Sequence, residues 1–274
     1  MNKFEIYQIF YDEKSRAILD SGFIPLDNTE NSRPDWGEFW VIRNFLNSRE
    51  LEEDKFYGFF SPKFHQKTGL QSSQVNDFIN SISPETDVIL FSPFWEYICF
   101  FLNPFEQGEY THAGLLSISR EFLNSTNRFS EVQSLVMHSG NSVFSNYFLA
   151  KPAFWRSWLS IGNDLFHCAE KCDHPLYARL NSNTIHGPNY YYSLKIFIQE
   201  RLASYLLATE KWNIANYSIF SMPWKINDHS IFRNELIACD ALKQQFCKNR
   251  DNVYIDEYFR LKKEIARRIN ILIN

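Results

Sequence analysis

The chain has 274 residues, of which 45% are hydrophobic and 17% are aromatic, with only 9 glycines and 10 prolines. This composition excludes a disordered chain and is typical of a packed globular protein with a sizeable core. The formal net charge of -4 gives the chain no general attraction to nucleic acid, so we expect no nucleic-acid partner.

Alternating strands and helices are predicted for the first 150 residues. The pattern at 5-11 predicts a strand, and the segment 22-34, rich in Pro, Asn and Asp, predicts a loop. Next come helix 35-47, strand 56-61, helix 72-82, strand 87-92, helix 111-124 and a short strand at 146-150. Strands alternating with helices of this length imply crossover connections, and therefore an α/β fold with a mostly parallel central sheet flanked by helices.

Beyond residue 152 the pattern becomes mostly helical, with helices predicted at 153-171, 190-210, 232-248 and 251-272. We therefore expect a main domain over residues 1-210 and a helical C-terminal extension, residues 211-274, packed on it. The last helix contains RLKKEIARRINILI, which is strongly basic. One interpretation is peripheral contact with an anionic membrane surface, and the other is a solvated face packed on the body.

Cytoplasmic localisation is the expectation from the N-terminus and the cysteines. The stretch MNKFEIYQIFYDEK carries acidic residues where a secretion signal needs an uninterrupted apolar core. Five cysteines, an odd number, indicate free thiols in a reducing compartment. The apolar segment 88-105 contains Glu96, Asn103 and two prolines, and we interpret it as a buried strand that runs into a helix.

Two strand ends carry the same tripeptide, in YGFFSPKF at 57-64 and DVILFSPFW at 87-95. Ligands of parallel sheets bind outside the carboxyl ends of the strands, so Ser61, Lys63 and Trp95 are expected to face a crevice or its wall. Lys63 suits an anionic group such as a diphosphate. The alternative is that each proline only terminates its strand.

Other polar residues are candidates with a plain structural alternative. Asp27 and Asn28 could bind sugar hydroxyls or could simply form a turn. Glu38, Arg43 and Asn44 are the polar members of an apolar helix, where ion pairing or solvation is the alternative.

The stretch NPFEQGEYTHAGLL supplies Glu106, Glu109 and His112 around a glycine. A carboxylate there could act as a general base or could cap a helix.

A metal site is suggested by HCAEKCDH at 167-174, but no second ligand pair has zinc spacing, and we interpret the thiols as core residues. The chain also lacks G-x-x-x-x-G-K-[ST], G-x-G-x-x-G, G-x-S-x-G and H-E-x-x-H. These absences weigh against the chemistry of P-loop proteins, dinucleotide-binding proteins, α/β-hydrolases and zincins.

The order of several blocks resembles bacterial surface-polysaccharide glycosyltransferases of the GT-A kind, and most closely the galactofuranosyltransferase domains of O-antigen and capsule clusters. The blocks are LDNTENS, EFWVIRNFL, YGFFSPKF, NYFLAKPAFWRSWL and KIFIQERLASYLL, within residues 5-210. The sequence departs from the family at Ser61-Pro62-Lys63, where many GT-A enzymes hold a metal with Asp-x-Asp. The His-Tyr-Arg-Arg turn of that family is also absent, so the resemblance does not name the donor sugar.

The resemblance implies transfer of a sugar from a nucleotide-sugar to a hydroxyl of a growing, lipid-linked glycan, beside other polysaccharide-assembly proteins at the inner face of the membrane. It implies no cofactor, and Lys63 favours metal-independent transfer over a divalent metal. The candidate bases are Glu109, Glu106 and Glu200, in that order, although Glu200 could be a buried partner of Arg201 or Lys195. The implied donor-binding residues are Asp27, Asn28, Arg43, Asn44, Ser61 and Lys63, and the acceptor-binding residues are His112, Asn146, Lys151 and Trp95. The alternatives are a non-catalytic interaction subunit of the same fold and a hydrolase acting on a phosphorylated sugar.

Overall fold

A six-stranded sheet forms the centre of the computed structural model, which describes residues 3–185, 190–223 and 232–268. The strands are β1 (Phe4–Phe10), β2 (Ile24–Asp27), β3 (Phe56–Phe60), β4 (Val88–Leu90), β5 (Phe148–Ala150) and β8 (Ile214–Asn216). Their order is β2-β1-β3-β5-β4-β8, and only β5 runs antiparallel to its neighbours among these strands. The predicted α/β class with a mostly parallel sheet is confirmed.

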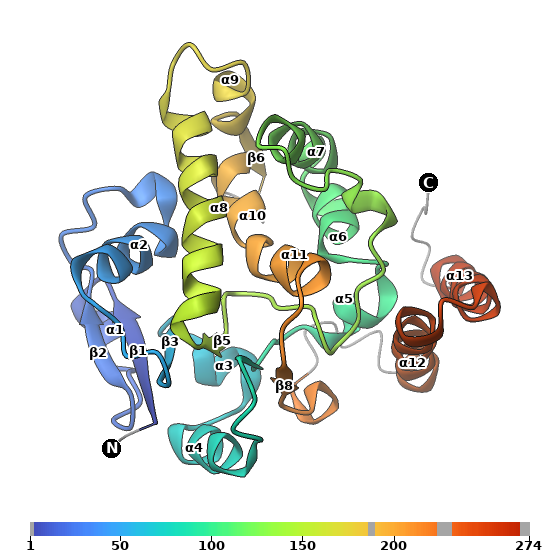
Figure 1. Cartoon of the computed structure of the whole chain (residues 1–274), viewed down its shortest axis with the longest axis horizontal. Helices are drawn as coiled ribbons and strands as arrows, with labels where there is room; N and C mark the ends of the chain where they lie inside the picture. The colour runs from blue at the N-terminus through green and yellow to red at the C-terminus, as the bar shows by residue number, and fades with distance from the viewer. Residues whose placement is uncertain (1–2, 186–189, 224–231, 269–274) are drawn as a thin grey trace.

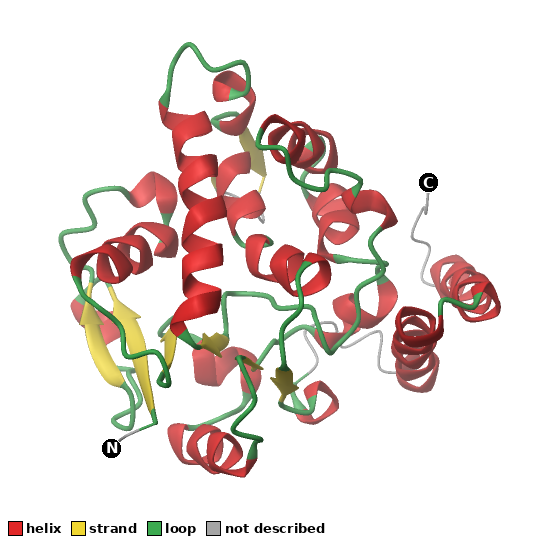
Figure 2. Cartoon of the chain, in the orientation of Figure 1, coloured by secondary structure: helices red, strands yellow, loops and turns green. Residues whose placement is uncertain are grey.

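Both faces of the sheet are covered by helices (Figures 1 and 2). Alternate side chains of each strand point to opposite faces, which places Tyr57 and Phe59 in one core cluster and Phe56 and Phe60 in another. The first cluster packs against α2 (Glu38–Ser48), α7 (Leu115–Ser125), α8 (Pro152–Glu170), α10 (Leu194–Gln199) and α11 (Leu202–Thr209). The second packs against α3 (Phe64–Thr68) and α4 (Ser72–Ser81).

The predicted loop 22-34 contains β2, which was missed. Residues Ile24–Asp27 pair in parallel with β1 at the edge of the sheet. An edge strand tolerates Pro25, because one side of such a strand needs no ladder donor, so the turn-forming composition concealed it. The connection from β1 contains the short helix α1 (Glu13–Arg16).

Two predicted helices are each divided by glycine. Helix 35-47 is a 3-10 turn at Pro34–Trp36 followed by α2, and Gly37 between them has a φ of 52°. The region predicted as helix 111-124 contains the end of α6 (Pro104–Thr111) and then α7, with Gly114 at a φ of 90°. Both glycines have a positive φ, which interrupts a helix and which other residue types adopt only at a cost.

The predicted helix 190-210 was wrong in its first part. Tyr191–Ser193 form β7, which pairs with β6 (Asn183–Ile185) in a separate two-stranded sheet. The remainder is α10 and α11, interrupted at Glu200 and Arg201. By contrast, α8 follows the predicted helix 153-171 closely and is succeeded by the short helix α9 (Tyr177–Leu180).

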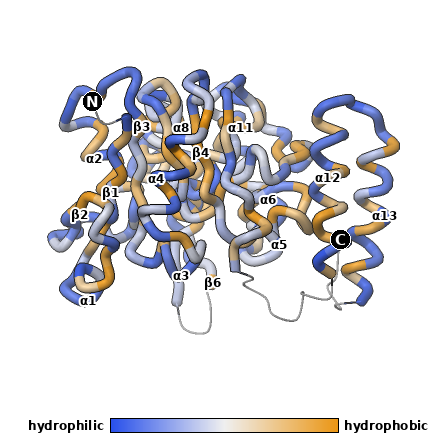
Figure 3. Tube along the Cα trace, turned by 90° about the horizontal axis from the view of Figure 1, so that it is seen from below, coloured by the Kyte–Doolittle hydropathy of each residue, from blue (hydrophilic) through white to orange (hydrophobic). Residues whose placement is uncertain are grey.

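The C-terminal helices α12 (Arg233–Asn249) and α13 (Asn252–Arg268) lie side by side at one end of the molecule (Figures 1 and 3). They pack on α5 (Trp95–Phe100), where Lys243 Nζ donates to the carbonyl of Phe101 at 2.7 Å and Tyr258 Oη donates to that of Phe100 at 2.8 Å. The last four residues of predicted helix 251-272 lie outside the described residues. Strand β8, within the predicted extension, belongs to the main sheet.

The described residues contain no helix whose length and apolarity would let it cross a bilayer. On α13, Arg260 is paired with Glu257 at 2.7 Å and with Glu264 at 3.2 Å, whereas Lys262 is buried against Glu106. Only part of the basic character of this helix therefore faces solvent, and its contact with a membrane surface stays a prediction.

Candidate functional site

Two adjoining cavities open at the carboxyl edge of the sheet. The large cavity, about 680 Å³, and the small cavity, about 250 Å³, share Lys67, Ser145, Phe197 and Glu200. Their walls include segments that follow β3 and β4 and the segment that precedes the antiparallel β5, and all of these lie at one edge. Strand β2 lies on one side of β1 and β3 lies on the other, so the order of strands reverses at β1. Open α/β sheets bind ligands at such a reversal.

Three wall residues adopt left-handed backbone conformations although none is glycine. Phe94 has a φ of 63°, and the consecutive residues Ser145 and Asn146 have φ values of 60° and 54°. Such conformations cost free energy and persist where the surrounding structure enforces them, often at functional sites. The strained turn ends two residues before β5, so the predicted strand 146-150 starts later than expected and leaves Asn146 in the cavity wall.

Two carboxylates line the small cavity. Glu38 comes from the first turn of α2, and Glu200 follows α10. Burial raises the pKa of the half-buried Glu38 to about 7, while the positive charge of Lys67 lowers this pKa and the negative charge of Glu200 raises it. A carboxyl group with a pKa near neutrality can both take and return a proton, which suits it to general acid and base catalysis.

Two lysines one helical turn apart supply positive charge. Lys67 on α3 donates to Ser145 Oγ at 3.0 Å, and its ammonium lies 5.7 Å from the ring centre of Phe94. Lys63, exposed at the start of α3, lines the large cavity as predicted for a residue at a strand end. Ser61 is buried and hydrogen-bonded to the Tyr147 hydroxyl, so it secures the end of β3 and does not line either cavity.

A buried arginine supports the wall of the large cavity. Arg201 donates to the carbonyls of Pro104 and Phe197, each at 2.6 Å, and to Gln107 Oε1 at 2.7 Å. Burial lowers the pKa of Arg201 to about 10, which still leaves the guanidinium charged at neutral pH. Gly108 is required beside it, because a Cβ there would lie 2.7 Å from Arg201 Nε.

His112 also belongs to this wall. Its ring stacks on Phe197 with the ring centres 3.6 Å apart, and the side chain is buried. The cleft thus brings together four residues of the sequence prediction: Lys63, His112, Asn146 and Glu200.

The first two candidate bases lie outside both cavities. Glu109 accepts hydrogen bonds from the backbone nitrogens of Gly114 at 2.9 Å and Leu116 at 2.7 Å, so it caps α7. Glu106 accepts from the nitrogen of Leu102 at 2.6 Å and pairs with Lys262. Both carboxylates thus take the structural role that was the alternative.

Four donor-binding candidates also lie elsewhere. Asp27 Oδ1 accepts from the nitrogen of Thr29 at 2.8 Å, and Asn28 follows β2 in the same turn. Arg43 donates to Asn163 Oδ1 at 2.7 Å, and Asn44 is exposed on α2.

Two acceptor-binding candidates are similarly displaced. Lys151 Nζ donates to the carbonyl of Pro84 at 3.1 Å. Trp95 is completely buried in the cluster formed with α12 and α13. Neither of these residues lines the two cavities.

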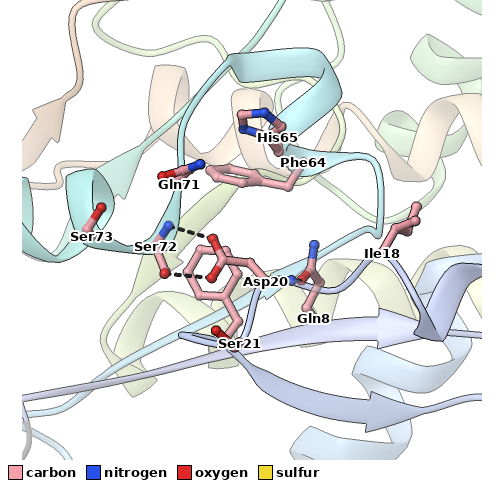
Figure 4. Close-up of a pocket in the computed structure, with 10 residues that line it drawn as sticks. Gln8, Ile18, Asp20, Ser21, Phe64, His65, Gln71, Ser72 and Ser73 are labelled. Atoms are coloured by element: carbon pink, nitrogen blue, oxygen red, sulfur yellow. Dashed lines mark hydrogen bonds between the residues drawn. The ribbon is translucent and has the colours of Figure 1, made fainter.

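A third cavity of about 460 Å³ lies between the segment after α1 and the start of α4, and Figure 4 shows its lining. Asp20 points at Ser72 and accepts from its backbone nitrogen at 2.7 Å and from its hydroxyl at 2.6 Å. Asp20 also accepts from the nitrogen of Gly22 at 2.9 Å. This carboxylate occupies the first turn of α4, where an external anion would otherwise bind.

Within the described residues, no three His, Cys, Asp or Glu side chains are grouped so that they could hold a metal ion. In the segment HCAEKCDH, Cys168 is buried as expected for a core thiol, whereas Cys172 is exposed. The interpretation of both thiols as core residues was therefore wrong for Cys172.

No family model, curated protein or solved structure matches this chain.

Three further cavity residues received no specific role from the sequence: Glu38, a candidate for which ion pairing or solvation was the alternative, Lys67, noted only as a cation near Lys63, and Gln199. Glu38 could have been assigned as a base from its place as a carboxylate in the first turn of an otherwise apolar helix. Lys67 could have been found by its spacing of four residues from Lys63, which places both on one helical face. Gln199 has no local signal, because it lies inside a predicted helix.

Proposed function

We propose that this chain is a glycosyltransferase, which moves a sugar from a nucleotide-sugar donor to a hydroxyl of a growing bacterial surface glycan of the O-antigen or capsule type. One observation carries the proposal: a cleft at the carboxyl edge of the sheet places the carboxylates of Glu38 and Glu200 beside Lys67. The mostly parallel sheet and the order of the sequence blocks support a GT-A-like fold.

The lysines are assigned to the donor diphosphate. Lys63 and Lys67 line the large cavity, and two ammonium groups can offset the charge that develops on a departing diphosphate. The proposed transfer uses these cations in the role that a divalent metal has in many related enzymes. Lys67 joins Lys63 in this role, because it reaches both cavities.

Glu38 is assigned as the general base and Glu200 as its neighbour. The acceptor hydroxyl gives its proton to Glu38 as its oxygen bonds to the anomeric carbon, and the bond from that carbon to the diphosphate oxygen breaks. Glu109 is less suited to this step, because both of its oxygens already accept backbone hydrogen bonds. The raised pKa of Glu38 makes its ionised form a stronger base than an ordinary carboxylate.

Calorimetric titration with UDP, GDP and CMP sugars tests the proposal. We expect one class of donor to bind and to be turned over when a polysaccharide precursor is added. Failure of every donor to bind at millimolar concentration would remove the enzymatic proposal. Binding without transfer would favour the non-catalytic subunit, and release of free sugar without an acceptor would favour a hydrolase.

Replacing Lys67 by Met tests the cation. The methionine keeps the length of the stem but removes the charge, so we expect donor turnover to fall at least tenfold, on the order of 1.4 kcal/mol. Because Lys67 lowers the pKa of Glu38, the pH at which the rate reaches half its maximum should also move upward.

Lys14→Met, at an exposed position on α1, is the matched control and should leave both quantities unchanged. The same assay in EDTA examines metal independence. Activity that disappears in EDTA and returns with manganese would refute the role given to the lysines.

A further inference from the structure

The small cavity contains two buried amides with unpartnered atoms. Asn146 is 2% exposed and Gln199 is 3% exposed, and both line the cavity. Asn146 Oδ1 and Gln199 Nε2 have no hydrogen-bond partner among the described residues. Native proteins seldom leave a buried acceptor and a buried donor unsatisfied, so both atoms point to a ligand that supplies the missing partners.

The chemistry of the walls restricts that ligand. Glu38 and Glu200 face the cavity against a single ammonium, that of Lys67, so an anionic group is disfavoured there. The carboxylates and Asn146 Oδ1 accept hydrogen bonds, whereas Gln199 and Lys67 donate them. A neutral ligand with several hydroxyl groups satisfies both kinds, because a hydroxyl both donates and accepts.

The volume of the small cavity and its apolar wall restrict the class of ligand further. A volume of about 250 Å³ lies just below the range of roughly 300–1,000 Å³ for drug-sized ligands, so it suits one small ring and not a whole nucleotide. Trp36, Ile196 and Phe197 supply apolar wall against which the C–H face of such a ring can pack.

We propose that the small cavity binds the single neutral sugar ring of the donor, with Asn146 accepting from one hydroxyl and Gln199 donating to another. This inference rests on the proposed function and names the part of the substrate that the small cavity takes. The diphosphate then lies near Lys67, where the two cavities meet, and the nucleoside lies in the large cavity.

Two variants remove the amides without disturbing the backbone. Gln199→Met keeps the length of the side chain. Asn146→Gly keeps the left-handed conformation, which glycine adopts freely. The matched controls are Gln245→Met, exposed on α12, and Asn127→Gly, an exposed position with the same φ of 54°.

The test compares calorimetric affinity for UDP-glucose, UDP-galactose and GDP-mannose with that for UDP and GDP alone. For the sugar nucleotide that binds the wild type, each amide variant should bind about tenfold more weakly. Affinity for the nucleoside diphosphate should stay the same, and both controls should match the wild type. Equal weakening of both ligands would overturn the assignment, since it would place the nucleoside in the small cavity, and unchanged binding of both would overturn it as well.

Thermal unfolding without ligand gives an independent measurement. An amide atom that lacks a partner does not stabilise the free protein, so Gln199→Met should unfold at the same temperature as the wild type or higher. A lower unfolding temperature with unchanged affinity would show a structural role and overturn the proposal. A wild type that binds neither the sugar nucleotides nor the diphosphates would instead defeat the proposed function itself.

Discussion

Glu38→Gln is expected to lower kcat/KM by about 100-fold or more, because it removes the proposed general base and keeps the shape of the side chain. Only the ionised carboxylate can accept the proton. Since burial raises the pKa of Glu38 to about 7, the wild-type rate should rise with pH through neutrality and level off above it. The residual rate of the Glu38→Gln variant should not show this rise with pH.

The measurement is a pH–rate profile for both proteins with a saturating donor. Glu50→Gln, an exposed carboxylate just beyond α2, is the control and should behave as the wild type. If Glu38→Gln retained the rise in rate near pH 7, the base would have to be another group.

The same substitution should stabilise the fold at high pH. The folded pKa of Glu38 lies above its ordinary value, so ionisation costs stability as the pH rises above about 4.5 and the cost is complete above about 7. Urea unfolding at pH 8 should therefore give Glu38→Gln a free energy of unfolding higher by up to about 3 kcal/mol, with a smaller difference at pH 5. A pH-independent difference would contradict the shifted pKa.

Arg201→Met is expected to lower the free energy of unfolding by about 3 kcal/mol, because the oxygens of Pro104, Phe197 and Gln107 would lose their donor. Urea unfolding measures this change. Arg120→Met removes a surface ion pair with Glu131 and should cost less than about 1 kcal/mol.

A double-mutant cycle shows whether Gly108 is needed only for Arg201. Gly108→Ala should destabilise the fold, because its Cβ would meet the pinned guanidinium. In the double variant with Arg201→Met, the loss of unfolding free energy should be smaller than the sum of the losses measured for the two single variants. Strict additivity would mean that Gly108 is constrained by something else.

Periodic patterns predicted the long elements well, and local composition misled where tertiary pairing decided the structure. The apolar stripe of α8 is visible in the sequence because one face of that helix packs on the core. In the sequence, residues 190-193 fit the helical pattern of the segment that follows them. Tyr191–Ser193 nevertheless form a strand, because they pair with Asn183–Ile185.

Lys63 was predicted because it follows a strand of the parallel sheet, at the edge where ligands bind. Asn146 and Glu200 were expected only through the resemblance of their sequence blocks, and His112 through its place near two carboxylates around a glycine. Glu38 and Lys67 come from helices that meet only in three dimensions. Glu109 illustrates a different difficulty, since an acidic residue near a helix start looks the same whether it caps the helix or catalyses a reaction.

Helices α12 and α13 form a C-terminal helical hairpin, and its contacts with α5 and α6 affect how the molecule unfolds. Lys243, Tyr258 and Lys262 supply donors to the end of α5 and to Glu106 on α6, and α6 carries residues of the large cavity. Loss of the hairpin would leave these acceptors buried without donors, so the helices under it could not keep their places. Although α12 and α13 are far along the chain from most residues of the cleft, they should not unfold separately from it. We expect the hairpin and the cleft to unfold together in one cooperative transition.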